Sequence, residues 1–119
     1  MTRIALLGAA LVTALALAAP IGAASSVTKL TGTVGPGFTI TLKKGTAKVK
    51  TLKAGTYKIT VNDKSNIHDF HLTGPGVNKM ITTTPFKGTK TVTVKLKKGT
   101  YRYICDPHAS VMKGSFKVT

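Results

Sequence analysis

The chain of 119 residues contains one cysteine, no tryptophan, no glutamate and only three aspartates. A single cysteine excludes an internal disulfide bond. No stretch between Ser26 and Thr119 has the hydrophobic period of an amphipathic helix, which argues against a fold built from helices. The length leaves room for one domain.

The N-terminal segment has the layout of a secretory signal peptide. A basic start is followed by an apolar run over Ile4–Ala19 and then by small residues, so we expect cleavage after Ala23 or Ala24. Residues 1–24 are therefore interpreted as a leader and residues 25–119 as the exported domain. The alternative is an uncleaved anchor, but the run is shorter than the roughly 20 residues of a spanning helix. A lipid-modified cysteine is excluded because the segment contains no cysteine.

Export makes the lone cysteine, Cys105, unusual. An exposed thiol outside the cytoplasm is liable to oxidation, and metal binding would remove that liability. The alternative is a buried, inert cysteine that behaves as a small apolar residue.

The exported part of the chain has the alternating pattern of half-buried β-strands. Apolar residues occupy every second position around Phe38–Leu42, Tyr57–Val61 and Val92–Leu96. Glycine-containing turns separate these runs and predict seven or eight short strands in an antiparallel β-sandwich. The loop Asn78–Thr84 is expected to hold at most a short turn. Two similar segments, Leu52–Tyr57 and Leu96–Tyr101, are interpreted as equivalent corners of two sheets.

Four potential metal ligands stand close together in the sequence or on strands that a sandwich can bring together. Cys105 is followed three residues later by His108 and seven residues later by Met112, and His68 lies 37 residues upstream of the cysteine. A thiolate, two imidazoles and a weak axial thioether are the ligands of a mononuclear electron-transfer copper site. Pro107 stiffens the spacer between the first two of these ligands.

The strand pattern favours His68 over His71 as the second imidazole. His68 shares a strand face with Phe70 and Leu72, which mark the core side. His71 falls on the opposite face with Asp69 and is interpreted as a solvated surface residue. The same alternation points Cys105 inward.

Two other chemistries compete with copper. Zinc prefers thiolate, imidazole and carboxylate ligands, so Met112 would have no role in a zinc site. A nucleophilic pair of Cys105 and His108 would need an orienting third group and an oxyanion hole, and the sequence indicates neither.

The motifs resemble those of the small blue-copper proteins of the plastocyanin/azurin type, the cupredoxins. The resemblance covers Val27–Thr119 and rests on three segments, His68–Phe70, Tyr103–His108 and Met112–Val118. It implies an all-β Greek-key sandwich, and one copper ion bound by His68, Cys105 and His108 and weakly by Met112. It also implies that His108, framed by small apolar residues, is the edge through which electrons pass.

The chain departs from the pattern of these proteins at Asp69, where asparagine is common. An ionised carboxylate accepts hydrogen bonds and donates none, so the Asp69 side chain is not expected to donate to the cysteine sulfur. The spacing of three residues between His108 and Met112 is shorter than in typical plastocyanins.

Positive charge is the other strong feature. Without the leader, 17 basic residues stand against three acidic ones, a net charge of +14. Lysines on strand surfaces discourage edge-to-edge pairing, but an imbalance this large should also steer acidic partners into contact. We expect a redox protein with an acidic contact surface, and an anionic membrane or envelope surface as a further partner. Nucleic acid is not expected, because the protein is exported and few aromatic residues accompany the basic ones.

These observations predict a monomeric, exported type 1 copper protein that carries single electrons by cycling between Cu(II) and Cu(I) and catalyses no reaction. Three histidines are too few for the second copper cluster of a multicopper oxidase. The alternatives are copper storage or delivery without an electron-transfer role, and a metal-free basic interaction module.

Overall fold

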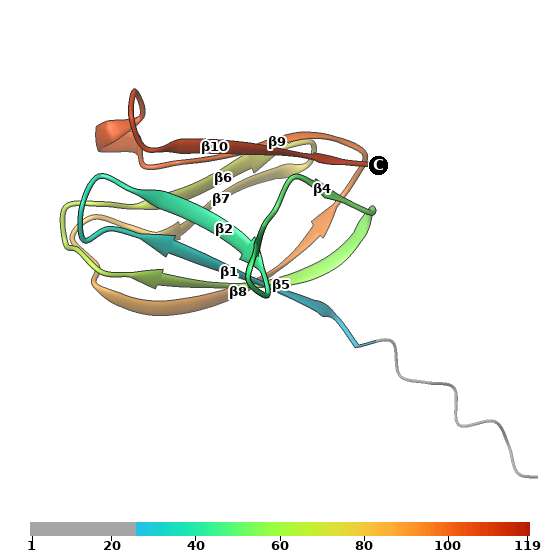
Figure 1. The fold of residues 1–119 in the computed structure, drawn as a ribbon, viewed down its shortest axis with the longest axis horizontal. Coiled ribbons are helices and arrows are strands. Elements are labelled where there is room, and N and C mark those ends of the chain that lie inside the picture. The colour runs from blue at the N-terminus through green and yellow to red at the C-terminus, as the bar shows by residue number, and fades with distance from the viewer. Residues whose placement is uncertain (1–25) are drawn as a thin grey trace, which may run out of the picture.

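The computed structural model describes residues 26–119, which form two five-stranded β-sheets packed face to face (Figure 1). Sheet A has the strand order β3-β2-β1-β5-β8 and sheet B the order β4-β10-β9-β6-β7. The elements are β1 (Thr28–Val34), β2 (Ile40–Lys44), β3 (Ala47–Lys48), β4 (Thr51–Leu52), β5 (Gly55–Asp63), β6 (Phe70–Gly74), β7 (Val77–Thr82), β8 (Gly88–Leu96), β9 (Gly99–Ile104), the 3-10 helix η1 (Asp106–His108) and β10 (Lys113–Val118). No helix among these residues is long and apolar enough to cross a membrane. The leader predicted for residues 1–24 lies outside the described part of the chain.

The predicted all-β Greek-key sandwich is confirmed, with one refinement of the strand count. Eight of the strands have five or more residues, and β3 and β4 have only two residues each. These two short strands carry the chain from sheet A to sheet B, and they are too short to leave an alternating pattern in the sequence.

Most neighbouring strands are antiparallel, as predicted, but each sheet also contains one parallel pair that the sequence did not indicate. β1 runs parallel to β5, and β4 runs parallel to β10. Parallel neighbours need a connection that crosses over, and here the connecting strands lie elsewhere in the sandwich. Periodicity within one strand carries no information about the direction of its neighbour.

Two local predictions also differ from the structure. Residues Val77–Thr82 form strand β7, where the sequence predicted a loop with at most a short turn. Phe38 was predicted to alternate with Ile40 as a core residue, but β2 begins only at Ile40 and Phe38 is 60% exposed. Gly35 and Gly37 stand on either side of Pro36, and the chain bends there, so Phe38 is not part of a strand.

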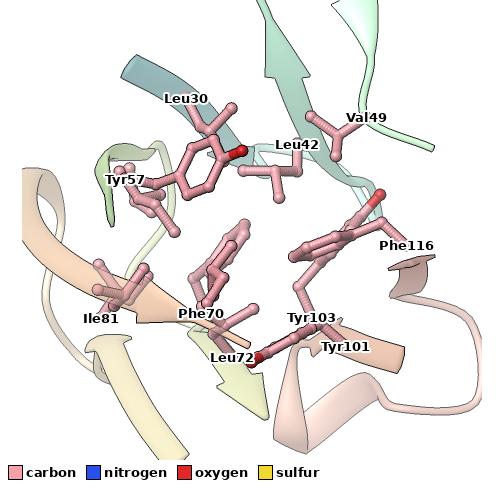
Figure 2. Close-up of a cluster of buried hydrophobic side chains, with 14 of the residues drawn as sticks. Leu30, Leu42, Val49, Tyr57, Phe70, Leu72, Ile81, Tyr101, Tyr103 and Phe116 are labelled. Carbon is pink, nitrogen blue, oxygen red and sulfur yellow. The ribbon is translucent and has the colours of Figure 1, made fainter. Parts of the chain in front are cut away.

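The core lies between the sheets and contains a series of stacked aromatic rings (Figure 2). The rings of Phe70 and Tyr103 stack with their centroids 5.7 Å apart, and those of Tyr101 and Phe116 stack at 5.4 Å. All four come from sheet B and are at least 98% buried. Aromatic rings in this arrangement contribute both area burial and favourable ring contacts. They give strands β6, β9 and β10 a rigid packing.

The two similar sequence segments form equivalent corners, as the sequence predicted. The Tyr57 hydroxyl donates to the Lys53 carbonyl at 2.6 Å, four residues back. The Tyr101 hydroxyl accepts a hydrogen bond at 2.9 Å from the backbone amide of Lys97, which is also four residues back. The same hydroxyl donates to the Pro75 carbonyl at 2.8 Å. Tyrosines that bond back to upstream backbone are a feature of Greek-key sandwiches.

We expect Tyr101→Phe to lower the free energy of unfolding by about 1–3 kcal/mol, because it removes two partly buried hydrogen bonds, one with the Lys97 amide and one with the Pro75 carbonyl. Urea denaturation of the copper-free protein measures this loss. Tyr57→Phe is the matched control: it removes a single hydrogen bond and should cost about 1 kcal/mol. Equal costs for the two variants would contradict the role assigned to the Tyr101 corner.

Candidate metal centre

Two loops at the end of the sandwich marked by η1 bring three potential ligands together. The loop between β5 and β6 carries His68, and the loop between β9 and β10 carries Cys105 and His108. β6 and β9 are hydrogen-bonded neighbours, with His71 opposite Ile104, so the loops that precede β6 and follow β9 lie side by side (Figure 1).

The ligand atoms of these residues face one another. The Nδ1 atoms of His68 and His108 are 3.1 Å apart, and the Cys105 Sγ atom lies 3.7 and 3.5 Å from them, respectively. The three atoms all lie within 4.8 Å of one another, a spacing that allows one metal ion to be held by all three. His68 and Cys105 are buried and His108 is partly exposed. The sequence predicted this trio.

The loop from Cys105 to Met112 is held in shape by its own backbone. The Cys105 amide donates to the Met112 carbonyl at 3.0 Å and closes the loop, and the Met112 amide donates to the His108 carbonyl at 2.8 Å. Pro107 lies in the first turn of η1, where a missing amide hydrogen costs nothing. The backbone therefore fixes the positions from which the three side chains extend.

Met112 is 1% exposed and is bonded through its backbone to both Cys105 and His108. Its side chain therefore lies in the interior, and its backbone lies beside two of the three residues. Its thioether as a fourth, weak ligand stays a prediction from the sequence.

Phe38 is a residue of the site that the sequence reasoning missed. Its ring lies edge-on to both imidazoles, with centroids 4.9 Å from His108 and 5.7 Å from His68. It comes from the loop between β1 and β2, on the opposite sheet from Cys105. Its alternation with Ile40 and Leu42 indicated a core position, so the sequence carries no signal of this contact.

Gly35 makes room for the buried imidazole. Its φ angle of +73° is in the left-handed region, and a side chain at this position would come within 2.9 Å of the His68 ring. Glycine is therefore required there both by the backbone conformation and by the contact.

Asp69 ties the two loops together, although not through a donor on its side chain. Its backbone amide donates to Cys105 Sγ at 3.4 Å, and its Oδ1 atom accepts a bond from the Asp106 amide at 2.7 Å. Burial raises the pKa of the Asp69 carboxyl, against the opposing effect of that hydrogen bond. The sequence expectation that the side chain does not donate to the sulfur agrees with this geometry, and the backbone supplies the donor.

We expect Asp69→Asn to preserve the connection between the loops and Asp69→Ala to break it. Asparagine keeps an oxygen that can accept from the Asp106 amide, whereas alanine leaves that amide unpaired at a cost of about 1–3 kcal/mol. Denaturant unfolding of both copper-free variants measures the difference. If the two variants are equally stable, the carboxylate does not hold the loops together.

Burial raises the pKa of the Cys105 thiol, and hydrogen bonds from the backbone amides of Asp69 and His108 only partly oppose the effect. A nucleophilic cysteine needs the opposite shift. A cation bound beside the sulfur would compensate the buried thiolate, so the environment suits a metal ligand better than a free nucleophile.

His71 is not one of the converging ligands, as the strand pattern predicted, but it is more than a solvated residue. Its Nδ1 atom lies 3.0 Å from the Asp106 carboxylate, and its Nε2 atom contacts Asn78. Burial opposes protonation of His71, but the bonds to Asn78 and Asp106 and the nearby carboxylate charges outweigh it and raise its pKa. This pair is the only ion pair among the described residues.

Folding raises the pKa of His71, so the protonated imidazole should stabilise the folded protein. This contribution should be fully present below the pKa that His71 has in the unfolded chain, and it should be lost as the pH rises through the pKa of the folded protein. We expect it to be at most about 1 kcal/mol, since Asp106 is solvent-exposed. Comparing the unfolding free energies of the wild type and His71→Gln at pH 5.5 and pH 8.5 measures it. If the two proteins differ more in unfolding free energy at pH 8.5 than at pH 5.5, the predicted direction of this pH dependence is wrong.

The comparisons with known proteins agree with this site. A family model described as copper-binding proteins of the plastocyanin/azurin family matches residues 33–119. The chain therefore belongs to the plastocyanin/azurin family of copper-binding proteins, and copper is its cofactor.

Solved structures share the fold at low sequence identity. Rusticyanin is 21% identical with a TM-score of 0.55, and the match covers 79% of this chain and 80% of rusticyanin. Auracyanin A, a blue copper protein from Chloroflexus aurantiacus, is 19% identical with a TM-score of 0.54, over 79% of this chain and 100% of auracyanin. A chain of a heme-copper terminal oxidase dimer is 21% identical with a TM-score of 0.54. This match covers 76% of this chain and 63% of the oxidase chain. A comparison with curated protein sequences found no match.

The donors present fit a single copper ion. Cu(I) favours soft sulfur and Cu(II) accepts imidazole nitrogen, and the site offers one thiol and two imidazole Nδ1 atoms with no carboxylate among the converging atoms. The carboxylate of Asp69, the residue after His68, is engaged with the Asp106 amide.

Proposed function

We propose that this protein is a type 1 copper protein that carries single electrons outside the cytoplasm and catalyses no reaction of its own. Its ligands are His68, Cys105 and His108, with Met112 as a weak fourth ligand. The observation that carries this proposal is the convergence of one sulfur and two Nδ1 atoms in a buried, backbone-fixed site. Copper bound there supplies a centre that gains or loses one electron.

The protein keeps the ligands in place whichever charge the centre has. The Asp69 amide bonds to the Cys105 sulfur, and the loop closure between Cys105 and Met112 restrains both ends of the ligand loop. A site that is rigid before metal binds needs little rearrangement when an electron arrives.

The partly exposed His108 is the proposed contact for a redox partner. Among residues 26–119, three of the four exposed large apolar residues lie in loops at this end of the sandwich: Phe38 is 60% exposed, Ile67 48% and Val111 64%. A small apolar patch around one imidazole edge suits a transient interface. Lys64 and Lys113 flank the same loops, and they support a partner with an acidic contact surface.

Absorption spectroscopy and redox cycling of the copper-loaded protein test this function. An intense copper-thiolate band should appear with copper, disappear with His68→Ala, and be lost and regained through repeated reduction and reoxidation while an excess of chelator is present. Copper storage or delivery is the second candidate. It predicts slow electron exchange and transfer of the copper to the chelator.

We also propose that residues 1–24 are removed during export and that the product is periplasmic, envelope-bound or secreted. The apolar run and the small residues before Ser25 support cleavage. Mass spectrometry of the protein from its host should find an N-terminus near Ser25. An intact N-terminus together with membrane retention would support the anchor instead.

A further inference from the structure

A line of lysines crosses the solvent-facing side of sheet A, with one lysine on each strand. The strands alternate buried and exposed residues, so the exposed positions define this outer face. The lysines are Lys48 on β3, Lys43 on β2, Lys29 on β1, Lys58 on β5 and Lys95 on β8. We call them the lysine band. Neighbouring strands are about 4.8 Å apart, so the band spans roughly 19 Å across the strands. It runs obliquely, because Lys43 lies opposite Thr31 and Lys95 lies opposite Thr56.

The band contains like charges in direct opposition. Lys43 is the register partner of Lys48, and Lys29 is the register partner of Lys58. Like charges directly opposite each other destabilise a sheet. A lysine on an edge strand such as β3 can prevent pairing with the sheet of another molecule. That role does not account for Lys29 and Lys58, which lie on the inner strands β1 and β5.

No acidic residue relieves this repulsion. Two of the three aspartates, Asp69 and Asp106, lie in the metal-site loops, and Asp63 is buried at the same end. Within residues 26–119, no lysine pairs with a carboxylate. The band is therefore a row of uncompensated cations on a stable sheet, which is the expected electrostatic complement of an anionic ligand.

The basic surface continues around the edge of the sandwich. Beyond β3, a hollow of about 320 Å³ is lined by Lys48, Arg102, Lys113 and Ser115. Arg102 and Ser115 are register partners on the outer face of sheet B. The cations thus follow a curved path from the outer face of one sheet to that of the other.

We propose that the lysine band and this hollow bind a linear polyanion that carries phosphate groups along its length. A flexible chain can follow the path around the edge, whereas a flat bilayer cannot reach both outer faces at once. None of the exposed large apolar residues lies in a strand of sheet A, so these strands offer no large apolar side chain to insert into a bilayer. It also has no exposed aromatic ring on which a nucleic-acid base could stack.

The neighbouring threonines complete the surface. Thr31, Thr60 and Thr91 form one row across β1, β5 and β8, and the hydroxyls of Thr60 and Thr91 are 2.9 Å apart. Hydroxyls can donate to phosphate oxygens between the lysine contacts. The lysine band is separate from the metal-site loops, and only Lys113 in the hollow also flanks one of them. A polymer bound along the band therefore leaves the His108 edge free.

Titration with long-chain inorganic polyphosphate tests the proposal on the copper-loaded protein. The variant Lys29→Gln/Lys43→Gln/Lys58→Gln/Lys95→Gln should bind at least about tenfold more weakly, and its slope of log affinity against log salt should fall by about three, at roughly 0.7 per lost contact. The control changes the same number of charges elsewhere: Lys53→Gln/Lys79→Gln/Lys87→Gln/Lys98→Gln. It should keep most of the affinity.

Further readouts separate the explanations. The band variant should melt at a temperature equal to or above that of the wild type at low salt, because the opposed charges are removed, and every variant should retain the copper-thiolate band. Arg102→Gln should weaken polyphosphate binding but not binding to vesicles containing phosphatidylglycerol.

Equal loss of affinity in the band and control variants would overturn the proposal in favour of diffuse net charge. Loss of vesicle binding alone in the band variant would overturn it in favour of a lipid surface.

Discussion

Cys105→Ser is expected to abolish the copper-thiolate absorption band and to weaken copper binding by at least about 100-fold. The sulfur is one of the three converging ligand atoms and the only thiol in the chain. Loss of groups that merely support ligands already costs 10–100-fold in metal affinity, so loss of a ligand should cost more. Copper titration followed by visible absorption measures both quantities.

The matched control for this prediction is His71→Gln. His71 comes from the strand that follows His68, but its nitrogens face Asp106 and Asn78 and not the trio. The control should therefore keep the absorption band and bind copper with unchanged stoichiometry. Circular dichroism of the copper-free Cys105→Ser protein should show a folded sandwich, because the serine hydroxyl can accept the Asp69 amide. Loss of the band in both variants would contradict the assignment of His68 as the second imidazole.

Gly114→Ala is expected to destabilise the protein by about 3 kcal/mol or more. Gly114 is the register partner of Tyr103, and a Cβ atom at this position would overlap the tyrosine ring. That ring is 1% exposed and stacks on Phe70, so it has no free space into which to move. Overpacking of a dense core costs about 1–3 kcal/mol or more, and here it meets a rigid ring.

Gly37→Ala is the control for this prediction, because a Cβ atom there meets nothing within 4 Å. We expect it to be neutral or slightly stabilising, by up to about 1 kcal/mol. Denaturant unfolding of the two copper-free variants gives the comparison. Tyr103 lies two residues before Cys105, so Gly114→Ala should also weaken copper binding. A stable Gly114→Ala protein would mean that the Tyr103 ring does not fill the space above this glycine.

The convergence of His68, Cys105 and His108 could be predicted from the sequence because few residues of this chain can bind a metal through sulfur or imidazole. Cys105 and His108 stand in one short segment, and strand alternation alone separates His68 from His71. The buried side chains of β5 and β9 follow the same alternation. Patterns of period two are local, so they survive in the sequence whatever the order of the strands.

The features that were not predicted depend on contacts between distant segments. Phe38 reaches the two imidazoles from the opposite sheet, and nothing in its own neighbourhood indicates that contact. The parallel pairing of β1 with β5, and with it the opposition of Lys29 and Lys58, follows from the order of strands in the sheet. The backbone bond from Asp69 to the sulfur could not be read from a side-chain identity.

Titration of the protein with copper in competition with zinc tests the central claim most directly. The account predicts one copper ion per chain, tighter binding of copper than of zinc, and an intense sulfur-to-copper absorption band that is bleached by one electron and restored on reoxidation. Tighter binding of zinc, or copper binding without that band, would contradict it.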